Sequence, residues 1–256
     1  MPNLSKKQLT KISLSQSCKA IILGSLLGDG SLKLYKPYKN ARFWIRHSWI
    51  QKEYWEWKIS QLIEIQTPKS YQVQKPQGFS QQKKLLFQSA ALEQLTEIYQ
   101  MTYKKNRLQI KRTWLNHLTP LSLAVWWLDD GSIIGNGKRG VFCTDNLSKK
   151  EQILLQRYLF VQWKINVRIG KLNKSKEIFR LYLNTTSLKQ FLYLIMPYAP
   201  IPSMIYKYCI LYKDTELQER WISEMMVAFK HFPQIKKNQI RSIINERKMQ
   251  LKYFRK

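Results

Sequence analysis

Two acidic residues, Asp29 and Asp130, stand 101 positions apart, and each lies at the end of an apolar run and is followed by glycine. A carboxylate at the C-terminal end of a helix faces the negative pole of the helix dipole, at a cost of a few tenths to ~1 kcal/mol. If the two helices pack side by side, the carboxylates converge and need a compensating charge. Oxygen ligands without nearby histidine or cysteine favour Mg²⁺ over zinc. The spacing therefore predicts a metal site.

A simpler interpretation of each Asp-Gly step is a turn, because this dipeptide is a common turn signal. One copy leaves both interpretations open. Two copies, each ending an apolar helix in a strongly basic chain, favour the metal site. In both copies we expect the glycine, Gly30 or Gly131, to adopt the left-handed conformation that often ends a helix.

The segments after the two aspartates predict the same order of elements twice. Two capping boxes, Ser48-x-x-Gln51 and Ser148-x-x-Glu151, open helices 100 positions apart. Strands are indicated where apolar and polar residues alternate. The expected first unit has strands at 31–38, 41–48, 70–75 and 83–88 and helices at 50–65 and 90–101; the second has a strand region reaching Cys143, strands at 164–171 and 178–184, and helices at 151–160 and 187–196. We interpret this as a duplicated αββαββα unit.

Charge narrows the class of partner. The chain has 256 residues, 44% of them apolar, and a formal charge of +28, far above the magnitude of about 2–8 usual for a small domain. Nucleic acid is favoured over a membrane surface, because no basic amphipathic anchor stands out. No apolar run approaches membrane-spanning length and no secretory leader is evident, so we expect a soluble protein.

Metal-ligand and disulfide patterns based on cysteine or histidine are not indicated. The three cysteines and the three histidines are scattered without the spacing of a zinc site or a disulfide framework. The excess of Lys, Ile, Asn, Tyr and Phe over Ala and Gly fits an AT-rich gene, which points to an organelle.

The stretches "ILGSLLGDG" (22–30) and "LAVWWLDDG" (123–131) resemble the two copies of the motif that names the LAGLIDADG family. The resemblance covers about 17–213 and is greatest to single-chain, intron-encoded homing endonucleases. It implies an α+β fold of two pseudo-symmetric αββαββα halves. Each half carries a four-stranded antiparallel saddle sheet, and the two halves pack through the two motif helices.

The resemblance also implies a metal site. It assigns the metal ligands to Asp29 and Asp130, with the carbonyls of Gly28 and Asp129 as additional ligands. The implied ion is Mg²⁺, with Mn²⁺ as a substitute and Ca²⁺ as an ion that supports binding without cleavage.

Two letters of the family motif differ here. The first acidic letter is replaced by Leu27 and Leu128. The small residue at the helix contact is Gly24 in the first copy but Val125 in the second, which predicts an asymmetric contact between the helices.

Basic residues late in each repeat complete the implied site. In the second half, "PYAPIPSMIYK" nominates Lys207, and in the first half "YKKNRLQIK" offers Arg107, Lys105 or Lys104, with spacing favouring Arg107. Each could instead contact phosphate. His47 ends a strand near the site, where it either positions a water molecule or has a purely structural role.

The polar faces of the strands are expected to lie in the DNA major groove, where side chains distinguish all four base pairs. A given member could contact phosphate or solvent instead. The candidate DNA-binding residues are Lys33, Tyr35, Arg42, Trp44, Arg46, Gln72, Gln74, Lys164, Asn166, Arg168, Arg180 and Tyr182.

The sequence thus predicts a metal-dependent, site-specific DNA endonuclease that makes a double-strand break in a long, non-palindromic target. The alternative is an RNA maturase or non-cleaving binding protein of the same fold. We expect a monomer that needs double-stranded DNA but no protein or membrane partner, located in a chloroplast or mitochondrion. The expected regions are a basic arm (1–16), two repeats (17–115 and 116–213) and a basic C-terminal extension (214–256).

Overall fold

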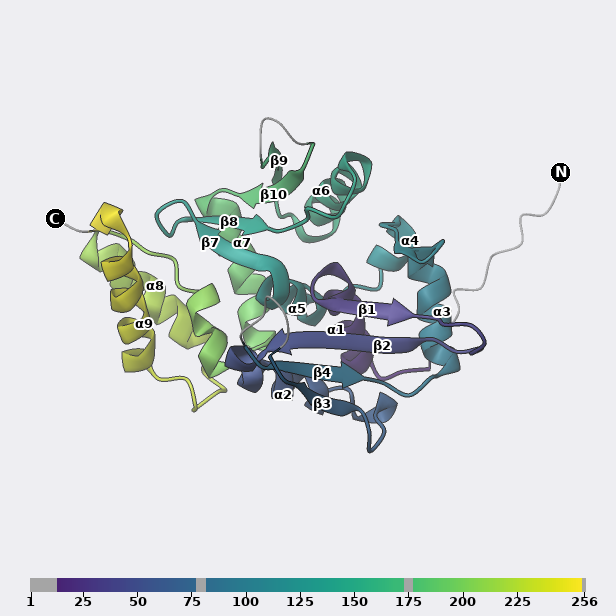
Figure 1. Cartoon of the computed structure of the whole chain (residues 1–256). Helices are drawn as coiled ribbons and strands as arrows, with labels where there is room; N and C mark the ends of the chain where they lie inside the picture. The colour runs from purple at the N-terminus through teal and green to yellow at the C-terminus, as the bar shows by residue number, and fades with distance from the viewer. Residues whose placement is uncertain (1–12, 77–81, 173–176, 255–256) are drawn as a thin grey trace.

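The computed structural model describes residues 13–76, 82–172 and 177–254 (Figure 1). Most of the expected N-terminal arm, residues 1–12, lies outside them. Two αββαββα units follow each other along the chain, as the repeated sequence pattern predicts. The first comprises α1 (Gln16–Leu27), β1 (Gly30–Lys33), β2 (Arg42–Ser48), α2 (Lys52–Ser60), β3 (Tyr71–Gln74), β4 (Lys84–Gln88) and α3 (Glu93–Thr102). The second comprises α5 (Pro120–Asp130), β7 (Gly131–Ile134), β8 (Arg139–Phe142), α6 (Lys149–Trp163), β9 (Arg168–Lys171), β10 (Phe179–Leu183) and α7 (Thr185–Ile195).

Both sheets are antiparallel and have the same topology. The strand order is β1-β2-β4-β3 in the first and β7-β8-β10-β9 in the second. Gly30 pairs with Ile45 in the first sheet, and Gly131 pairs with Phe142 in the second. These matching registers make the strand end at His47 equivalent to the one at Thr144.

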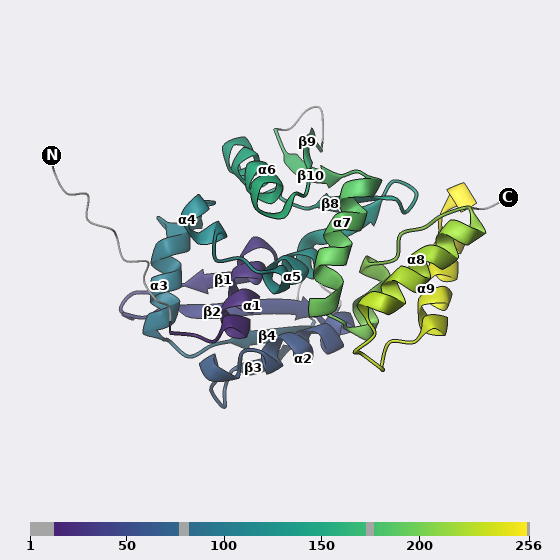
Figure 2. The same cartoon turned by 180° about the vertical axis from the view of Figure 1, so that it is seen from behind.

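Short elements connect and extend the two units. A hairpin of β5 (Tyr103–Lys104) and β6 (Arg107–Leu108) precedes α4 (Arg112–Leu115) between the halves. The C-terminal extension forms α8 (Thr215–Ala228) and α9 (Lys237–Gln250), which pack beside the second half (Figures 1 and 2). The 3₁₀ turns are η1 (Trp49–Gln51), η2 (Ile63–Ile65), η3 (Met196–Tyr198), η4 (Pro202–Lys207) and η5 (Lys252–Phe254).

Helices α1 and α5, the two motif helices, lie side by side at the centre of the molecule (Figure 2). They approach closely because Gly24 has no side chain: a Cβ there would lie 2.4 Å from the carbonyl oxygen of Ser122 and 2.9 Å from Cβ of Val125. The predicted asymmetry of this contact is confirmed, since a glycine of one helix faces a valine of the other.

The side chains after Val125 fill the second half. The Trp126 ring stacks on Phe142 with centroids 4.0 Å apart, and Trp127 meets both Phe142 and Phe191 edge-on. All four rings are fully buried. Burial of aromatic surface of this size contributes several kcal/mol, so α5 is held by its own sheet and by α7 as well as by α1.

The expected left-handed glycines after the two aspartates are not found. Gly131 has φ −79°, and Gly30 is not among the glycines with positive φ. Steric closeness explains the residue type instead. A Cβ at Gly131 would lie 2.1 Å from the Trp127 ring, and one at Gly30 would lie 2.6 Å from Cβ of Ser25.

Of the two predicted capping boxes, the second is confirmed and the first is wrong. Ser148 and Glu151 bond each other's backbone reciprocally at the start of α6. Ser48 makes no capping bond: the chain enters α2 through η1, and the Ser48 hydroxyl donates to Gln82 at 2.9 Å. The expected strand at 164–171 is shorter than predicted, since Lys164 is the left-handed cap of α6 with φ 58°.

Within the described ranges, no helix is long and apolar enough to cross a membrane.

Candidate active site

The two aspartates singled out from the sequence lie at the C-terminal ends of the paired motif helices. Asp29 lies two residues after the last residue of α1, next to the C-cap Gly28, and Asp130 is the last residue of α5. Burial, with the charge of Asp129 adding to it, raises the pKa of Asp29 to about 6. Burial and the charge of Asp29 raise the pKa of Asp130 to about 7. The structure therefore brings together two carboxylates that repel each other.

Neither carboxylate forms an ion pair with a described lysine or arginine, although the charge of Lys207 partly opposes the rise in both pKa values. Among the described residues, Asp130 makes no side-chain hydrogen bond or ion pair, and the Asp29 carboxylate has only an approach of 3.5 Å to Nδ1 of His47. The Asp29 side chain is 39% exposed, so the pair opens to solvent. Unpaired, partly buried carboxylates of this kind are suited to a divalent cation.

Asp129, by contrast, points its side chain away from Asp130 and into the first half. Its carboxylate is fully buried and accepts from Lys58 Nζ at 2.8 Å on both oxygens. Tyr54 donates to the same carboxylate at 2.7 Å. Space for it comes from Gly28, where a Cβ would lie 2.4 Å from Cβ of Asp129. The backbone N–H of Asp29 completes the set at 3.2 Å.

This buried ion pair fixes the charge state of its members. Burial by itself disfavours an ionised Asp129, but the Lys58 ammonium outweighs it and holds the pKa of the carboxyl below its ordinary value. Burial, together with the neighbouring Lys58 charge, lowers the pKa of His47 to about 3, so its ring is neutral. With Nε2 of His47 at 3.3 Å from Lys58 Nζ, the ring accepts there and carries its proton on Nδ1, toward Asp29.

Lys58 and Tyr54 were not identified from the sequence. Their i, i+4 spacing places them on one face of α2, the face that also carries buried Trp55. A lysine on an otherwise apolar helix face was the available signal. It is ambiguous in a chain with 44 lysines and arginines, because such residues usually reach solvent along their aliphatic stems.

The predicted Lys207 lies at this site and the predicted Arg107 does not contact it. Lys207 is 8% exposed and donates to the carbonyls of Leu128 at 2.6 Å and Asp129 at 3.2 Å. Burial lowers the pKa of Lys207, and the three neighbouring aspartates oppose that shift. Arg107 is 65% exposed in the β5–β6 hairpin and lies 3.8 Å from Glu151.

The donor set fits a hard divalent cation at Asp29 and Asp130 better than at Asp129. Ligand atoms of Asp29, His47 and Asp129 lie within 4.8 Å of one another, but Lys58 already supplies the positive charge that Asp129 requires. Two polar atoms at repeat-equivalent positions, Nδ1 of His47 and Oγ1 of Thr144, are buried and find no hydrogen-bond partner among the described residues. Such orphaned atoms are typical of positions completed by water or an ion.

A family model matches most of this chain: the LAGLIDADG DNA endonuclease family, over residues 19–191. The chain belongs to this family. Among curated proteins it is 31% identical over 202 residues to a protein RecA of Mycobacterium gastri, a match covering 73% of this chain and 46% of that protein. It is 30% identical to the cytochrome b mRNA maturase bI2 of Saccharomyces cerevisiae, covering 76% of this chain and 48% of that protein. The chain thus spans about half the length of the first curated relatives it matches.

Other LAGLIDADG relatives match over most of their length. A probable intron-encoded endonuclease 1 of Wickerhamomyces canadensis is 29% identical, and the match covers 79% of this chain and 87% of that protein. The solved structure of the homing endonuclease I-WcaI bound to its DNA recognition sequence is 24% identical with a TM-score of 0.66, covering 76% of this chain and 86% of that chain. This likeness confirms the predicted fold class.

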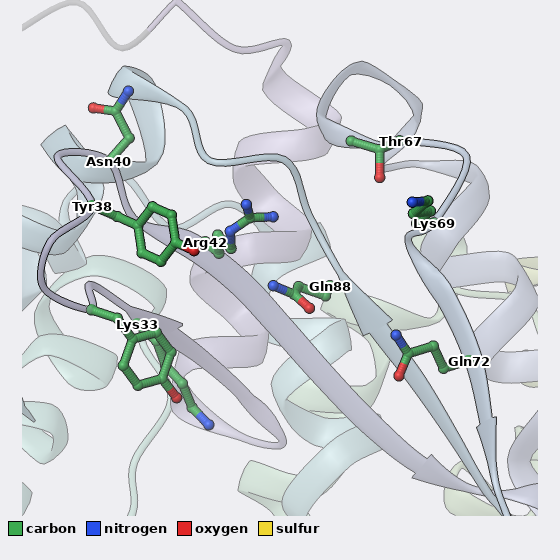
Figure 3. A pocket seen from close by; sticks show the side chains of 9 residues that line it. Lys33, Tyr38, Asn40, Arg42, Thr67, Lys69, Gln72 and Gln88 are labelled. Atoms are coloured by element: carbon green, nitrogen blue, oxygen red, sulfur yellow. The ribbon is translucent and has the colours of Figure 1, made fainter.

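The first LAGLIDADG sheet exposes a polar face built from neighbouring strands. Register places Trp44 opposite Gln88, and Arg46 opposite Leu86, which in turn pairs with Gln72. A hollow of about 330 Å³ lies over this face (Figure 3). Its lining residues are Lys33, Tyr35, Tyr38, Asn40, Arg42, Thr67, Lys69, Gln72 and Gln88. Of the predicted candidates of the first half, Lys33, Tyr35, Arg42 and Gln72 therefore share this hollow with further polar groups.

The corresponding face of the second sheet is smaller and partly self-paired. A hollow of about 240 Å³ is lined by Asn166, Arg168 and Tyr182, among others. Arg180 instead forms two short bonds with Asp145, at 2.5 and 2.6 Å. Lys164 is exposed and bonds the carbonyl of Val161 at the end of α6.

Proposed function

We propose that this LAGLIDADG chain is a site-specific, metal-dependent DNA endonuclease of the homing type. The proposed reaction is a double-strand break in a long, non-palindromic target. The observation that carries the proposal is the pair of unneutralised carboxylates, Asp29 and Asp130, at the adjacent ends of the motif helices. A structural role alone gives no reason to retain two carboxylates that repel each other.

The proposed metal ligands are Asp29 and Asp130, with the carbonyl of Gly28 as a further ligand. The carbonyl of Asp129 is the weaker candidate, because it accepts a bond from Lys207. Bound Mg²⁺ or Mn²⁺ would activate a water and stabilise negative charge on the scissile phosphate. Ca²⁺ is expected to support DNA binding without cleavage.

Protein side chains supply the other groups that the proposed cleavage needs. Lys207 holds an ammonium beside the end of α5, where it stabilises charge that develops on the phosphate. In the first half we assign the equivalent buried positive charge to Lys58 in place of Arg107, since Lys58 lies beside Asp129 and His47. Neutral His47, with its Nδ1 proton toward Asp29, is suited to holding a water molecule.

The exposed sheet faces are proposed to bind the DNA major groove. The polar residues of each face project from alternate positions of adjacent strands, a spacing that suits contacts to successive bases. The chain's +28 charge supplies the attraction to phosphate. Because the two faces differ in sequence, the recognised site is expected to be asymmetric, and one chain is expected to suffice.

A second candidate function is RNA maturation, which the similarity to a curated mRNA maturase favours. An intron-encoded origin and an organellar location would suit either function. The experiment that separates them is selection of cleaved duplexes from a random or genomic DNA library in Mg²⁺. Recovery of one recurrent site cut on both strands supports the endonuclease. Absence of cleavage, with tight binding to intron RNA, would replace it by the maturase.

Chelation and ion exchange test the metal. Cleavage of the selected duplex should stop in chelator and return with Mg²⁺, while a gel shift in Ca²⁺ persists. Undiminished cleavage in chelator would overturn the assignment of Asp29 and Asp130 as metal ligands.

A further inference from the structure

Five consecutive backbone carbonyls, at the end of η4 and directly after it, each accept a hydrogen bond from a side chain. The segment they belong to, residues 206–210, carries Lys207. The donors are Arg247 to Tyr206 at 2.6 Å, Trp127 to Lys207 at 2.9 Å, Trp221 to Tyr208 at 3.1 Å, Arg247 to Cys209 at 3.0 Å, and Gln218 to Ile210 at 3.1 Å. Most of these donors belong to the C-terminal extension, with Gln218 and Trp221 on α8 and Arg247 on α9.

The segment lies between the motif helix α5 and the extension. On one side, Trp127 of α5 holds the Lys207 carbonyl while the Lys207 ammonium reaches the last carbonyls of α5. On the other side, Arg247 bridges the carbonyls of Tyr206 and Cys209 across the Lys207 position. The backbone on both flanks of Lys207 is therefore fixed by one guanidinium from α9.

Burial makes the bonds to the carbonyls of Lys207, Tyr208 and Ile210 hard to replace by water. The bond from Arg247 to Cys209 is partly buried, and the one to Tyr206 is exposed. Tyr208, Cys209, Ile210 and Trp221 are completely buried. A buried carbonyl that loses its donor costs about 1–3 kcal/mol, and bonds from a charged donor are stronger than neutral ones. Losing one donor would therefore shift the segment rather than leave it in place.

A second arginine of α9 has a different arrangement. Arg241 lies about two turns before Arg247 and forms a two-bond ion pair with Glu219 of α8 at 2.7 and 3.0 Å. It joins the two helices of the extension and does not bond the 206–210 segment. The chain thus offers a matched control: two arginines on one helix, one bonded to the lysine-bearing backbone and one bonded to α8.

We propose that the C-terminal extension is a positioning element for the active-site Lys207, with Arg247 as its main contact and Trp221 and Gln218 in support. The inference rests on the proposed endonuclease function. A misplacement of about 1 Å in a charge-stabilising group lowers catalysis by about 10²-fold. The extension therefore acts on the chemical step from outside the region matched by the family model, which ends at residue 191.

The test compares Arg247→Ala with Arg241→Ala on the selected duplex. Single-turnover cleavage in Mg²⁺, gel-shift affinity in Ca²⁺ and thermal unfolding are measured for each. Arg247→Ala should cleave roughly 10- to 100-fold more slowly with affinity within about 2-fold of wild type. Arg241→Ala should cleave at nearly the wild-type rate. Should Arg247→Ala fold poorly, Arg247→Lys replaces it. This variant keeps the charge but loses the planar guanidinium whose Nη1 donates both bonds, and it should show a smaller slowing.

Combination with Lys207→Met separates positioning from general stability. If Arg247 acts through Lys207, adding Arg247→Ala to Lys207→Met costs no further rate, because the group being positioned is gone. Multiplicative losses in the double variant, or equal slowing by Arg241→Ala, would overturn the inference in favour of a merely structural extension.

Two further outcomes are decisive. Loss of affinity in Ca²⁺ by Arg247→Ala would assign the extension to the DNA-binding surface instead. Wild-type cleavage by Arg247→Ala refutes the positioning role alone and leaves the endonuclease standing, whereas a wild-type chain that cuts no duplex refutes the endonuclease and the inference together.

Discussion

The two sides of the site, built from a duplicated unit, are not alike. On the first-half side, the ends of α2 and β2 supply Lys58 and His47 around the buried carboxylate of Asp129. On the second-half side, Lys207 reaches only backbone carbonyls. The repeat-equivalent residue of Asp129 is Gly28, which has no side chain and leaves space for Asp129.

This difference shows how a duplicated fold becomes a single asymmetric molecule. A carboxylate from the second half is neutralised by an ammonium from the first, so the two halves are tied by a buried ion pair as well as by helix packing. Replacing such a pair by apolar groups is often neutral, whereas removing one partner is costly. The pair therefore joins the two halves and neutralises the Asp129 carboxylate, although that carboxylate lies within 4.8 Å of the ligand atoms of Asp29 and His47.

The largest effect is expected on the cleavage rate, when one of the two converging carboxylates is removed. Asp130→Asn or Asp29→Asn should slow cleavage by about 10²-fold or more, as loss of a charge-stabilising group does. Affinity for DNA should hold or rise, because a negative charge facing phosphate is gone. Strand cleavage and gel shift on the selected duplex check both variants.

Asn tolerates the same turns as Asp, so a turn-forming role predicts no effect. Cleavage of both strands at the wild-type rate by either variant would remove that residue from the site.

The second-largest effect is expected on the free energy of unfolding, when the buried ion pair between the two halves is broken. Lys58→Met leaves the buried Asp129 charge uncompensated and should lower the free energy of unfolding by about 3–5 kcal/mol. The double variant Lys58→Met, Asp129→Leu should recover much of that loss, because both charges are removed together. Urea unfolding measures all three proteins.

Lys52→Met is the matched control, since Lys52 forms an exposed i, i+4 pair with Glu56 on the same helix, and pairs of this kind contribute about 0.3–0.5 kcal/mol. A Lys58→Met loss as small as that of the control would mean that the buried pair does not tie the halves.

The pH dependence distinguishes the strained carboxylates from the compensated one. The pKa of Asp130 is raised from 3.8 to about 7 by burial and by Asp29. A raised carboxyl pKa means that the folded state binds the proton more tightly, so its charge destabilises the metal-free protein increasingly from pH about 4 to about 7. Asp130→Asn should therefore match wild type near pH 4 and exceed it in stability at pH 7 and above.

Thermal unfolding in chelator, from pH about 4 to above 7, measures the difference in stability between wild type and Asp130→Asn. His47, whose pKa is lowered, contributes to the pH dependence of both proteins equally and cancels in this difference. Saturating Mg²⁺ should erase the difference or reverse it, since only the wild type retains both ligands. A difference that does not vary with pH would argue against convergence of the two carboxylates.

The smallest effects are expected on the sheet faces. Arg168→Met removes an exposed charge and should reduce the magnitude of the slope of log K against log salt by about 0.9. Arg180→Met should change the slope less, because Asp145 already balances that guanidinium. Filter binding in Ca²⁺ over a range of salt concentrations measures both. Equal slopes for the two variants would mean that Asp145 releases Arg180 to phosphate when DNA binds.

Local sequence determined most of the secondary structure. Alternation in 178–184 and the reciprocal Ser148–Glu151 cap predicted β10 and the start of α6, because each signal lies within a few neighbouring residues. The first cap was wrong because the 3₁₀ turn η1 separates Ser48 from α2, whose N-cap residue is Gln51. The left-handed glycines were wrong because Gly30 and Gly131 are the first residues of β1 and β7, and Gly131 has extended backbone with φ −79° and ψ 147°. The need for glycine comes from the closeness of Trp127 and Ser25.

What the sequence by itself determined is the duplication, the αββαββα order and the placement of Asp29 and Asp130 at equivalent helix ends, since all of these follow from periodicity and from spacing along the chain. Only the tertiary structure decided which basic groups lie at those ends. Lys58 meets Asp129 across 71 residues, and Arg247 meets Tyr206 across 41. Such partners depend on how closely the helices pack, here through Gly24. The local sequence around a lysine or arginine does not indicate whether the side chain will be buried against a carboxylate or exposed to water.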